Sequence, residues 1–277
     1  MTPVPKPRPL NQPPAKAVEI SAGPKRRLRQ QFLSGEVETV RINRLLADLG
    51  ISSRRGADEL IKSGAVTVNA ERAVLGQQIE LSDEVRVRGE KIDLDEEKRY
   101  LYLLLYKPVG ITCTTDPRRR DNIISYLNLE ERMFPVGRLD RDSEGLILLT
   151  NDGNIVNRIL RVENAHEKEY IVTVNRPYDN DFLSKMSHGV EILDQTTLPC
   201  KLKPETDTRF RIILRQGLNR QIRRMCEALG YQVTKLIRCR IMHLSRGRMR
   251  PGDYRYLSAK EELELLRLTK HPRDDKK

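Results

Sequence analysis

The apolar residues of this 277-residue chain occur in short runs, and the length of those runs limits what the chain can fold into. The longest run, Tyr100–Tyr106, has seven residues, whereas a helix that crosses a bilayer needs about twenty. Runs of this length are typical of buried strands. We therefore expect a strand-rich protein without a membrane span. At about 150 residues per domain, the length favours two domains.

Such runs alternate with short helical patterns from Tyr100 to about Leu268. The expected strands are Tyr100–Tyr106, Ile111–Thr115, Gly145–Leu149, Glu169–Asn175, Leu198–Lys203, Phe210–Leu214, Val233–Arg238 and Tyr254–Leu257. The expected helices are Asn122–Leu129, Gly153–Leu160, Asp179–Met186, Asn219–Leu229 and Ser258–Leu268. The last helix begins with a capping box, Ser258 and Glu261. Many strands with scattered helices predict an α+β domain over 100–268 with a mostly antiparallel sheet.

The beginning of the chain has a different composition. The first thirty residues hold seven of the fifteen prolines and seven Lys or Arg, against one acid, Glu19. Because proline removes backbone donors and few large apolar side chains are present, we predict a disordered basic tail over 1–39. An organelle-targeting peptide is the rival interpretation, but such peptides are Ser-rich and amphipathic, and this segment is neither. A phosphate-binding arm and a solvated leader without function both stay open.

Residues 40–93 are expected to form a small helix–helix–strand domain. One apolar stripe defines its first helix: Ile42, Leu45, Leu46 and Leu49. Ser52 or Ser53 can cap the second helix, which Gly64 ends. Val66–Val68 and Val85–Val87 alternate like short strands. The charged stretch Asp93–Arg99 is expected to be a linker, and residues 269–277 a charged tail.

The charge balance indicates a polyanionic partner. The formal net charge is +12 and the sequence pI is near 9.6, which favours nucleic acid and, less often, an anionic membrane surface. The densest basic region runs from Arg215 to Arg250, where ten Lys or Arg face one acid, Glu227. Phosphate is the obvious counter-charge for such a cluster.

The cysteines indicate a reducing compartment. Cys113, Cys200, Cys226 and Cys239 are 87, 26 and 13 residues apart, and no CxxC pair occurs. A zinc knuckle and a thioredoxin-like motif are therefore excluded. With no apolar segment near the start to act as a secretory signal, we expect reduced thiols, a cytoplasmic protein and no metal site.

The small domain carries residue types that suit phosphate, because a guanidinium donates two parallel hydrogen bonds. They lie on the first helix, at the start of the second, and in the turn after the first strand: Arg41, Arg44, Arg54, Arg55 and Asn69. Composition alone supports a solvated charged face equally well. The motifs Arg41-Ile-Asn-Arg-Leu-Leu, Gly50-Ile-Ser-Ser-Arg-Arg, Gly64-Ala-Val-Thr-Val-Asn and a later Val-Arg-Val, however, resemble the αL RNA-binding domain first known in a small-subunit ribosomal protein. Arg44 stands where that family commonly has Lys.

The loop Gly137–Gly145 runs directly into an apolar strand and contains Asp140 between two arginines. A carboxylate at the mouth of a strand can reach a substrate, and arginine neighbours keep it ionised. Alone this signal is weak, because surface loops with alternating charges are common.

Five motifs in order give that loop its context. They are Lys107-Pro-Val-Gly-Ile, Phe134-Pro-Val-Gly-Arg-Leu-Asp, Gly145-Leu-Ile-Leu-Leu-Thr-Asn-Asp-Gly, His166-Glu-Lys-Glu-Tyr and Gln216-Gly-Leu-Asn-Arg-Gln-Ile-Arg-Arg-Met. Together they resemble the pseudouridine synthases of the RsuA/RluB/RluF group, and the last motif is most similar to the RluF branch. The resemblance spans roughly Val40 to Leu268 and implies a synthase domain with a central catalytic cleft.

The resemblance also implies roles for particular residues. Asp140 matches the catalytic aspartate, Tyr170 the active-site tyrosine and Arg223 the basic residue that forms an ion pair with the aspartate. Leu214 matches the apolar residue on the other face of the uracil. By their position, Asn219 and Arg220 are assigned to substrate contact and Arg138 to the loop or a phosphate. Isomerisation of uridine needs no redox equivalent, metal or phosphate donor, so no cofactor is expected.

These observations predict an RNA pseudouridine synthase, active as a monomer, that modifies one uridine in large-subunit ribosomal RNA. A transfer RNA is the alternative substrate. A noncatalytic RNA-binding or ribosome-assembly factor on a degenerate synthase fold is the rival function, and the presence of Asp140, Tyr170 and Arg223 together argues against it. A metal-dependent nuclease is disfavoured because no acidic metal cluster appears. Whether Asp140 attacks C1′, attacks C6 or abstracts the C2′ proton is left open.

Overall fold

A computed structural model describes residues 4–6, 8–9, 26–27, 39–80, 82–92, 97–98, 100–116, 118–160 and 165–269. Contacts divide these residues into two units. One comprises the described residues of Glu19–Leu101 with Asn151–Gly153, and the other those of Met1–Val18, Tyr102–Thr150 and Asn154–Lys277. No helix among the described residues is long and apolar enough to cross a membrane.

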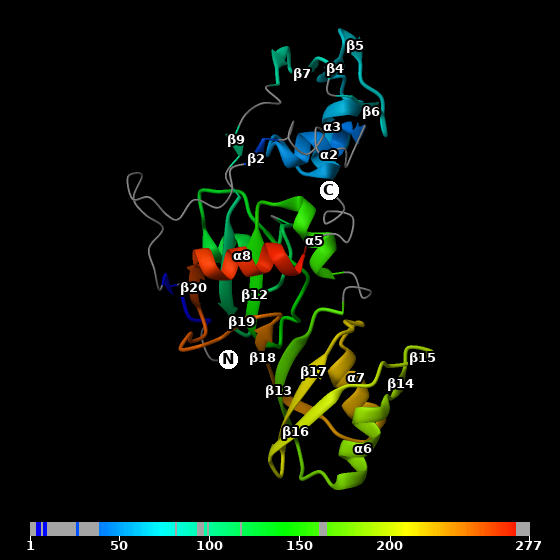
Figure 1. The fold of residues 1–277 in the computed structure, drawn as a ribbon, viewed down its shortest axis with the longest axis vertical. Helices are drawn as coiled ribbons and strands as arrows, with labels where there is room; N and C mark the ends of the chain where they lie inside the picture. Colours follow the sequence, from blue (N-terminus) through cyan, green and yellow to red (C-terminus); the bar gives the residue numbers. More distant parts are fainter. Residues whose placement is uncertain are drawn as a thin grey trace. The chain divides into compact units, whose positions relative to one another are not determined.

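The smaller unit packs two short helices against short strands (Figure 1). Its elements are β2 (Arg26–Arg27), β3 (Val40–Arg41), α2 (Ile42–Asp48), α3 (Arg54–Lys62), β4 (Val66–Val68), β5 (Glu71–Arg72), β6 (Gln78–Ile79), β7 (Val85–Val87), β8 (Glu90–Lys91) and β9 (Glu97–Lys98). The Ser53 side chain caps α3 by accepting from the Gly56 amide, and Gly64 follows the helix with a φ of 77°. The core is apolar, with Ile42, Leu45 and Leu46 fully buried.

The larger unit is built on one ten-stranded sheet. Its strands are β1 (Arg8–Pro9), β10 (Tyr102–Lys107), β11 (Phe134–Pro135), β12 (Glu144–Thr150), β13 (Lys168–Val174), β16 (Lys201–Thr206), β17 (Arg209–Leu214), β18 (Val233–Ile241), β19 (Leu244–Ser245) and β20 (Asp253–Tyr256). The main order is β1-β20-β10-β12-β18-β13-β17-β16, with β11 beside β12 and β19 beside β18. Only β1–β20 and β12–β18 pair in parallel, so the sheet is mostly antiparallel, as predicted.

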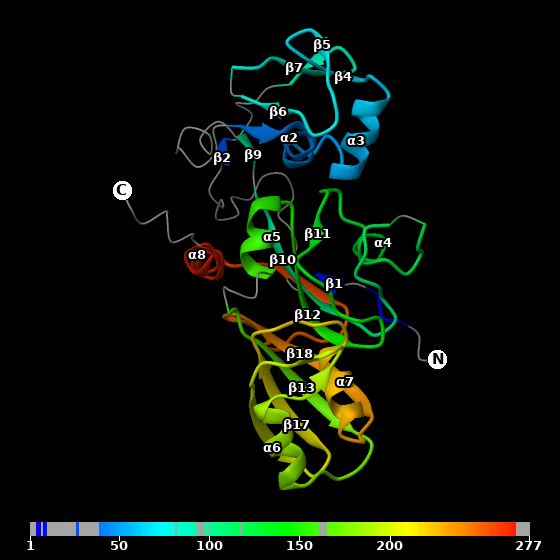
Figure 2. The same ribbon diagram turned by 90° about the vertical axis from the view of Figure 1, so that its right-hand side faces the viewer.

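The helices of this unit are α4 (Ile123–Leu127), α5 (Gly153–Leu160), α6 (Asn180–His188), α7 (Gln221–Ala228) and α8 (Ala259–Leu268), and β14 (Glu191–Ile192) with β15 (Gln195–Thr196) forms a separate hairpin. Helices α6 and α7 cover one face of β13 and β17, as Figures 1 and 2 show. Val172, Ile212 and Phe210 of the strands pack there with Met186 of α6 and Met225 of α7. Helix α8 begins with the predicted capping box.

The two halves of the sheet meet at a short parallel contact between β12 and β18. Only two residue pairs join there, Glu144 with Ile237 and Gly145 with Arg238. Gly145 has a φ of 119°, and a Cβ atom on it would lie 2.4 Å from the Arg238 carbonyl oxygen. Close approach of the two backbones therefore requires glycine here. The segment that enters β12 at this junction is the loop of Asp140.

Three sequence predictions differ from the structure. Ile111–Thr115 is not a strand, because the chain turns back so that the Thr112 amide donates to the Asp121 carbonyl, which leaves a single bridge to Asn122. Most of the predicted disordered tail lies outside the described residues, but Arg8–Pro9 pairs with β20 and Arg26–Arg27 with β9. At Arg8–Pro9 and Arg26–Arg27 backbone hydrogen bonding replaces the expected disorder, and the predicted 93–99 linker contributes β9 to the second of these pairings.

Candidate active site

The predicted catalytic residue, Asp140, lies in the loop between β11 and β12. The Ser143 amide donates to the Asp140 carbonyl oxygen at 3.1 Å, which closes a tight turn. Just before it, the Leu139 amide donates to the Cys113 Sγ at 3.4 Å. The backbone on each side of Asp140 is thereby held, while the Asp140 side chain remains 31% exposed. A substrate can thus reach a carboxylate that stands on a fixed loop.

Two arginines from the far end of the chain reach this loop. Arg220 immediately precedes α7, and its Nη1 lies 3.5 Å from Asp140 Oδ2 and 3.3 Å from Asp142 Oδ1. Its backbone is left-handed, with a φ of 50°, a conformation that costs energy for a residue with a Cβ. The αL conformation and the double contact place Arg220 across both carboxylates.

Arg223, the predicted ion-pair partner of Asp140, stands one turn further along α7. Its Nη2 donates to the Asp142 carbonyl and to the Ser143 hydroxyl, each at 3.1 Å, and its Nη1 donates to the Val233 carbonyl at 3.1 Å. The Nε is buried without a hydrogen-bond acceptor among the described residues and lies 4.0 Å from Asp140 Oδ2. Arg223 therefore mainly fixes the loop backbone, and its contact with Asp140 is longer than that of Arg220.

Asp142 joins the cluster although the sequence assigned it no role. Burial by itself would raise the pKa of Asp142, but the hydrogen bond from Arg220 and the charges of Arg223 and Arg220 outweigh burial and lower that pKa. Asp142 is thus held ionised beside Asp140. Two carboxylates and two guanidiniums form one charged cluster at the middle of the sheet.

Tyr170 and Leu214 lie on one face of neighbouring strands. In the β13–β17 register Lys168 is opposite Leu214 and Tyr170 is opposite Ile212. Residues paired in this way share a face, so Tyr170 and Leu214 are diagonal neighbours. Both pack with the cluster that includes α7, the helix of Arg223. Their common face agrees with the sequence prediction that they contact the same base.

Of the other predicted substrate contacts, Asn219 is exposed and bonded to a neighbour. Its carbonyl and its Oδ1 accept from the Arg224 guanidinium at 3.1 and 3.4 Å. Arg138 contributes a backbone carbonyl, which accepts from Arg238 Nη1 at 3.2 Å. This contact shows that the Arg138 backbone supports the loop, and the phosphate contact of the Arg138 side chain stays a prediction.

The sequence analysis did not identify two buried cations near the loop. Lys107, at the end of β10, is fully buried, and its Nζ donates to the Pro108 and Ile111 carbonyls at 2.8 and 2.9 Å. Burial lowers the pKa of Lys107 to about 8. Arg238 of β18 is only 4% exposed. The sequence contained a signal for each of them. Lys107 is a cation at the end of an apolar strand. Arg238 lies two residues after Leu236, so strand alternation places these two side chains on the same buried face.

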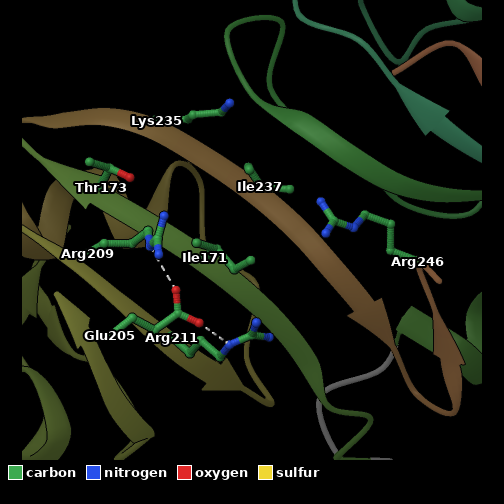
Figure 3. A pocket seen from close by; sticks show the side chains of 8 residues that line it. All are labelled: Ile171, Thr173, Glu205, Arg209, Arg211, Lys235, Ile237 and Arg246. Carbon is green, nitrogen blue, oxygen red and sulfur yellow. Dashed lines mark hydrogen bonds and ion pairs between the residues drawn. The ribbon is translucent and has the colours of Figure 1, made fainter. Parts of the chain in front are cut away.

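The opposite face of the same strands carries a separate hollow of about 390 Å³ (Figure 3). It is lined by Ile171, Thr173, Glu205, Arg209, Arg211, Lys235, Ile237 and Arg246. Glu205 lies between Arg209 and Arg211 and pairs with both. Strand alternation puts these residues on the face away from Tyr170 and Leu214, so this hollow is distinct from the candidate active site.

In the smaller unit, Arg41, Arg54 and Arg55 are exposed. Arg44 differs, because its Nε pairs with Asp48 at 3.4 Å. Asn69, which is also predicted to contact RNA, has both ends of its amide engaged in the turn. Its Nδ2 donates to Asp83 at 2.7 Å, and its Oδ1 accepts from the Glu84 amide at 2.8 Å.

Comparisons with known proteins match both units. Residues 101–228 match the family described as RNA pseudouridylate synthase, and residues 40–85 match the S4 domain. The motif predictions for the two parts of the chain are thereby confirmed at the level of family.

Among similar proteins, one from Escherichia coli (strain K12), named dual-specificity RNA pseudouridine synthase RluF, is 49% identical over 230 residues, covering 83% of this chain and 79% of the relative. Ribosomal large subunit pseudouridine synthase B of Bacillus subtilis (strain 168) is 35% identical over 240 residues, covering 83% of this chain and 97% of the relative. A solved structure described as a pseudouridylate synthase superposes with a TM-score of 0.60 at 28% identity, covering 82% of this chain and 99% of that one.

Proposed function

The chain belongs to the RNA pseudouridylate synthase family, and from that premise we propose that it converts a specific uridine of large-subunit ribosomal RNA to pseudouridine with Asp140 as the catalytic carboxylate. The name of the Bacillus subtilis relative supports this choice of RNA. The name of the Escherichia coli relative includes "dual-specificity", which favours a second RNA substrate, and transfer RNA is our candidate for it.

The reaction breaks the N1–C1′ bond of uridine and forms a C5–C1′ bond, while C5 loses a proton and N1 regains one. Atoms and electrons balance without an oxidant, a reductant or a donor. The chain must supply a group that attacks or takes a proton, a surface that holds the detached base, and cations that hold the attacking group in place. In the proposed mechanism Asp140 is the first, Tyr170 and Leu214 are the second, and Arg220 with Arg223 supplies the third.

The observation that carries the assignment is the convergence of two arginines from α7 and its N-terminal turn on the Asp140 loop. These two guanidiniums contact the Asp140 carboxylate and hold the backbone of its loop, so they place the group that would attack carbon or accept a proton. Asp140 is the better candidate than Asp142 because its contacts are longer. Arg220 donates hydrogen bonds to both carboxylates, at 3.3 Å to each oxygen of Asp142 and at 3.5 Å to Asp140. The Arg223 Nε lies 4.0 Å from Asp140. A carboxylate that is held less tightly is freer to react.

The detached base would lie on the face that Tyr170 shares with Leu214. Tyr170 is also placed in the proposed mechanism to assist removal of the C5 proton, because a phenol can act as a general base when hydrogen-bonded correctly in the complex. The exposed Arg41, Arg54 and Arg55 of the S4 domain would bind RNA phosphates. We leave Asn69 out of this set because its amide is engaged in the turn.

We further propose that the enzyme acts in the cytoplasm as a monomer and without a metal or organic cofactor. Two features support this part of the proposal: the isomerisation needs no external reagent, and one chain supplies every proposed group. Among the described residues, no three His, Cys, Asp or Glu side chains gather in a way that could hold a metal ion.

The decisive test is Asp140→Asn, which keeps the size of the side chain and removes its charge. We expect pseudouridine formation to fall by at least about 10⁴-fold, while RNA affinity changes little because phosphate contacts dominate it. Asp142→Asn is the matched control, and it should cost roughly tenfold by loosening Arg220. The measurement is tritium release from C5-labelled uridine in ribosomal and transfer RNA.

A wild-type rate in Asp140→Asn would contradict the catalytic assignment. If the wild-type protein itself made no pseudouridine in either RNA but bound them, the noncatalytic RNA-binding or assembly function would replace the proposal.

A further inference from the structure

Arg238 lies beneath the Asp140 loop and bonds to both of its ends. Its Nε donates to the Leu146 carbonyl at 2.7 Å, and its Nη1 donates to the Arg138 carbonyl at 3.2 Å. Arg138 precedes Asp140 by two residues, and Leu146 lies just inside β12 on the far side of the loop. One rigid guanidinium therefore spans the chain segment whose conformation sets the position of the Asp140 carboxylate.

This arginine is 4% exposed, and no carboxylate is paired with it among the described residues. Its Nη2 is buried and has no acceptor in the described part of the chain. Burial of a charge without a paired anion is unfavourable. If packing were the only requirement at this place, an apolar side chain would fill it at a lower cost in folding stability than an arginine. The fork geometry, which two separate carbonyls use, is the property that only arginine supplies.

The backbone of Arg238 pairs with both strands that flank β18, namely β12 and β13. It is the register partner of Gly145, at the end of the Asp140 loop, and of Tyr170 on β13. A Cβ on Gly145 would meet the Arg238 backbone at 2.4 Å, so the two backbones approach each other closely at this pair. Arg238 is thus the residue at which the Asp140 loop, the β12–β18 junction and the strand of Tyr170 meet.

The charge of Arg238 also affects titratable groups near the Asp140 loop. The charge of Arg238 contributes to lowering the pKa of Lys107, after burial, and Asp142 and Asp140 oppose that lowering. Arg238 also contributes, after burial, to lowering the pKa of Lys168. The Arg238 charge therefore acts on two lysines, and one of them, Lys107, also interacts with the charges of Asp142 and Asp140.

We propose that Arg238 is a positioning residue, which holds the Asp140 loop in its reactive geometry through the Arg138 and Leu146 carbonyls. This inference rests on the proposed catalytic role of Asp140. Arg238 does not touch the substrate in this mechanism. It acts by fixing where the Asp140 carboxylate stands relative to Tyr170 across the junction of β12 and β18.

The test is Arg238→Lys, which keeps the positive charge and loses the fork. Arg240→Lys is the matched control, because Arg240 lies on the same strand but pairs with Glu167 and Glu169 on the side away from the loop. A displacement of about 1 Å at a catalytic group can cost roughly 100-fold in rate, and we expect a loss of that order in kcat for Arg238→Lys with KM for RNA within about twofold. Arg240→Lys should keep both constants.

A second measurement keeps the proposal testable if Arg238→Lys folds poorly. Amide hydrogen exchange is measured over residues 138–146 in the wild type, Arg238→Lys and Arg240→Lys, and ¹⁵N-arginine spectra of the wild type report the exchange rate of the Arg238 Nε–H. We expect a protected Nε–H in the wild type and faster exchange in the loop only in Arg238→Lys. An Nε–H that exchanges like that of an exposed arginine would overturn the inference.

The outcomes also separate this inference from the proposed function. If Asp140→Asn is inactive and Arg238→Lys turns over at the wild-type kcat, Arg238 is not a positioning residue and the catalytic assignment stands. If Asp140→Asn is active, the proposed function fails at its own site. A loss in Arg238→Lys that appears in KM alone would assign Arg238 to RNA binding and overturn the positioning role.

Discussion

The two units of this protein use their cations in opposite ways. Between residues 39 and 101 no Lys or Arg side chain of the described residues is buried, and the arginines that suit RNA stand on the surface. The synthase unit instead buries Lys107 completely and Arg238 almost completely, both close to the Asp140 loop. Exposed cations increase the affinity of the protein for a polyanion and cost little in folding stability. Buried cations lower the folding stability, and what they provide in exchange is a fixed geometry of the groups to which they are hydrogen-bonded.

The largest effect that we expect from this difference between exposed and buried cations concerns Lys107. Its pKa in the folded protein is about 8, lowered mainly by burial, so the unfolded chain binds more protons between about pH 8 and pH 10.4. Stability therefore rises with pH through that window. Relative to Lys107→Met, the wild type should gain about 2 to 3 kcal/mol of unfolding free energy between pH 7 and pH 10.

The measurement is urea unfolding of both proteins at the two pH values. Lys260→Met, which removes an exposed lysine of α8, is the control and should show no such change. An equal difference between wild type and Lys107→Met at both pH values would mean that Lys107 titrates normally, and the contrast between the units would lose its main example.

The sequence predicted local features better than long-range ones. Signals within a few residues were read correctly: the Ser258–Glu261 capping box, the cap at Ser53 as one of two candidates, and the apolar run of β12. These features depend on local hydrogen bonds and on strand alternation, which neighbouring residues determine.

For the site, the sequence named candidate residues but not their geometry. That Arg220 lies closer to Asp140 than Arg223 does depends on a left-handed residue before α7 and on chain segments 80 residues apart. The Arg238 bond to Arg138 joins residues 100 apart. The Ile111–Thr115 strand was wrong because its backbone donors go to a turn rather than to a ladder. Long-range side-chain geometry of this kind has no local signal.

The next effect concerns the smaller unit, called the S4 unit here because it contains the S4 domain. If its exposed arginines only bind RNA, their removal should change the affinity for RNA and leave the rate of the reaction unchanged. Changing Arg41, Arg54 and Arg55 together to Gln removes three exposed cations. We expect RNA binding to weaken by roughly ten- to thirtyfold at moderate salt, and the slope of log K against log salt to fall by about two, because fewer counterions are released. The rate at saturating RNA should stay at the wild-type value.

The control for that variant removes three cations of the same unit that already pair with acids: Lys62 with Glu59, and Arg86 and Lys91 with Glu84. Changing these three to Gln should alter the salt slope much less. An unchanged slope in the first variant would show that Arg41, Arg54 and Arg55 are merely solvated. A lost rate at saturating RNA would break the separation between a binding unit and a catalytic unit.

The smallest effect compares one helix cap in each unit. Ser53 accepts a single bond, from the Gly56 amide at 3.0 Å. Ser258 belongs to a larger network in which Glu261 accepts from the Ser258 amide and from both Nη atoms of Arg255. Loss of a serine cap typically costs about 1 kcal/mol, and we expect Ser53→Ala to cost about that amount in the S4 unit.

Ser258→Ala should cost less, about 0.5 kcal/mol, because the Glu261 carboxylate still satisfies the Ser258 backbone amide and remains bound to Arg255. Glu261→Gln should cost more than either serine change, because it removes the charge that the fork of Arg255 binds. Thermal unfolding of the three variants ranks them. If Ser258→Ala proved as costly as Glu261→Gln, the hydroxyl rather than the carboxylate would hold the start of α8, and the cap of the synthase unit would be as local as that of the S4 unit.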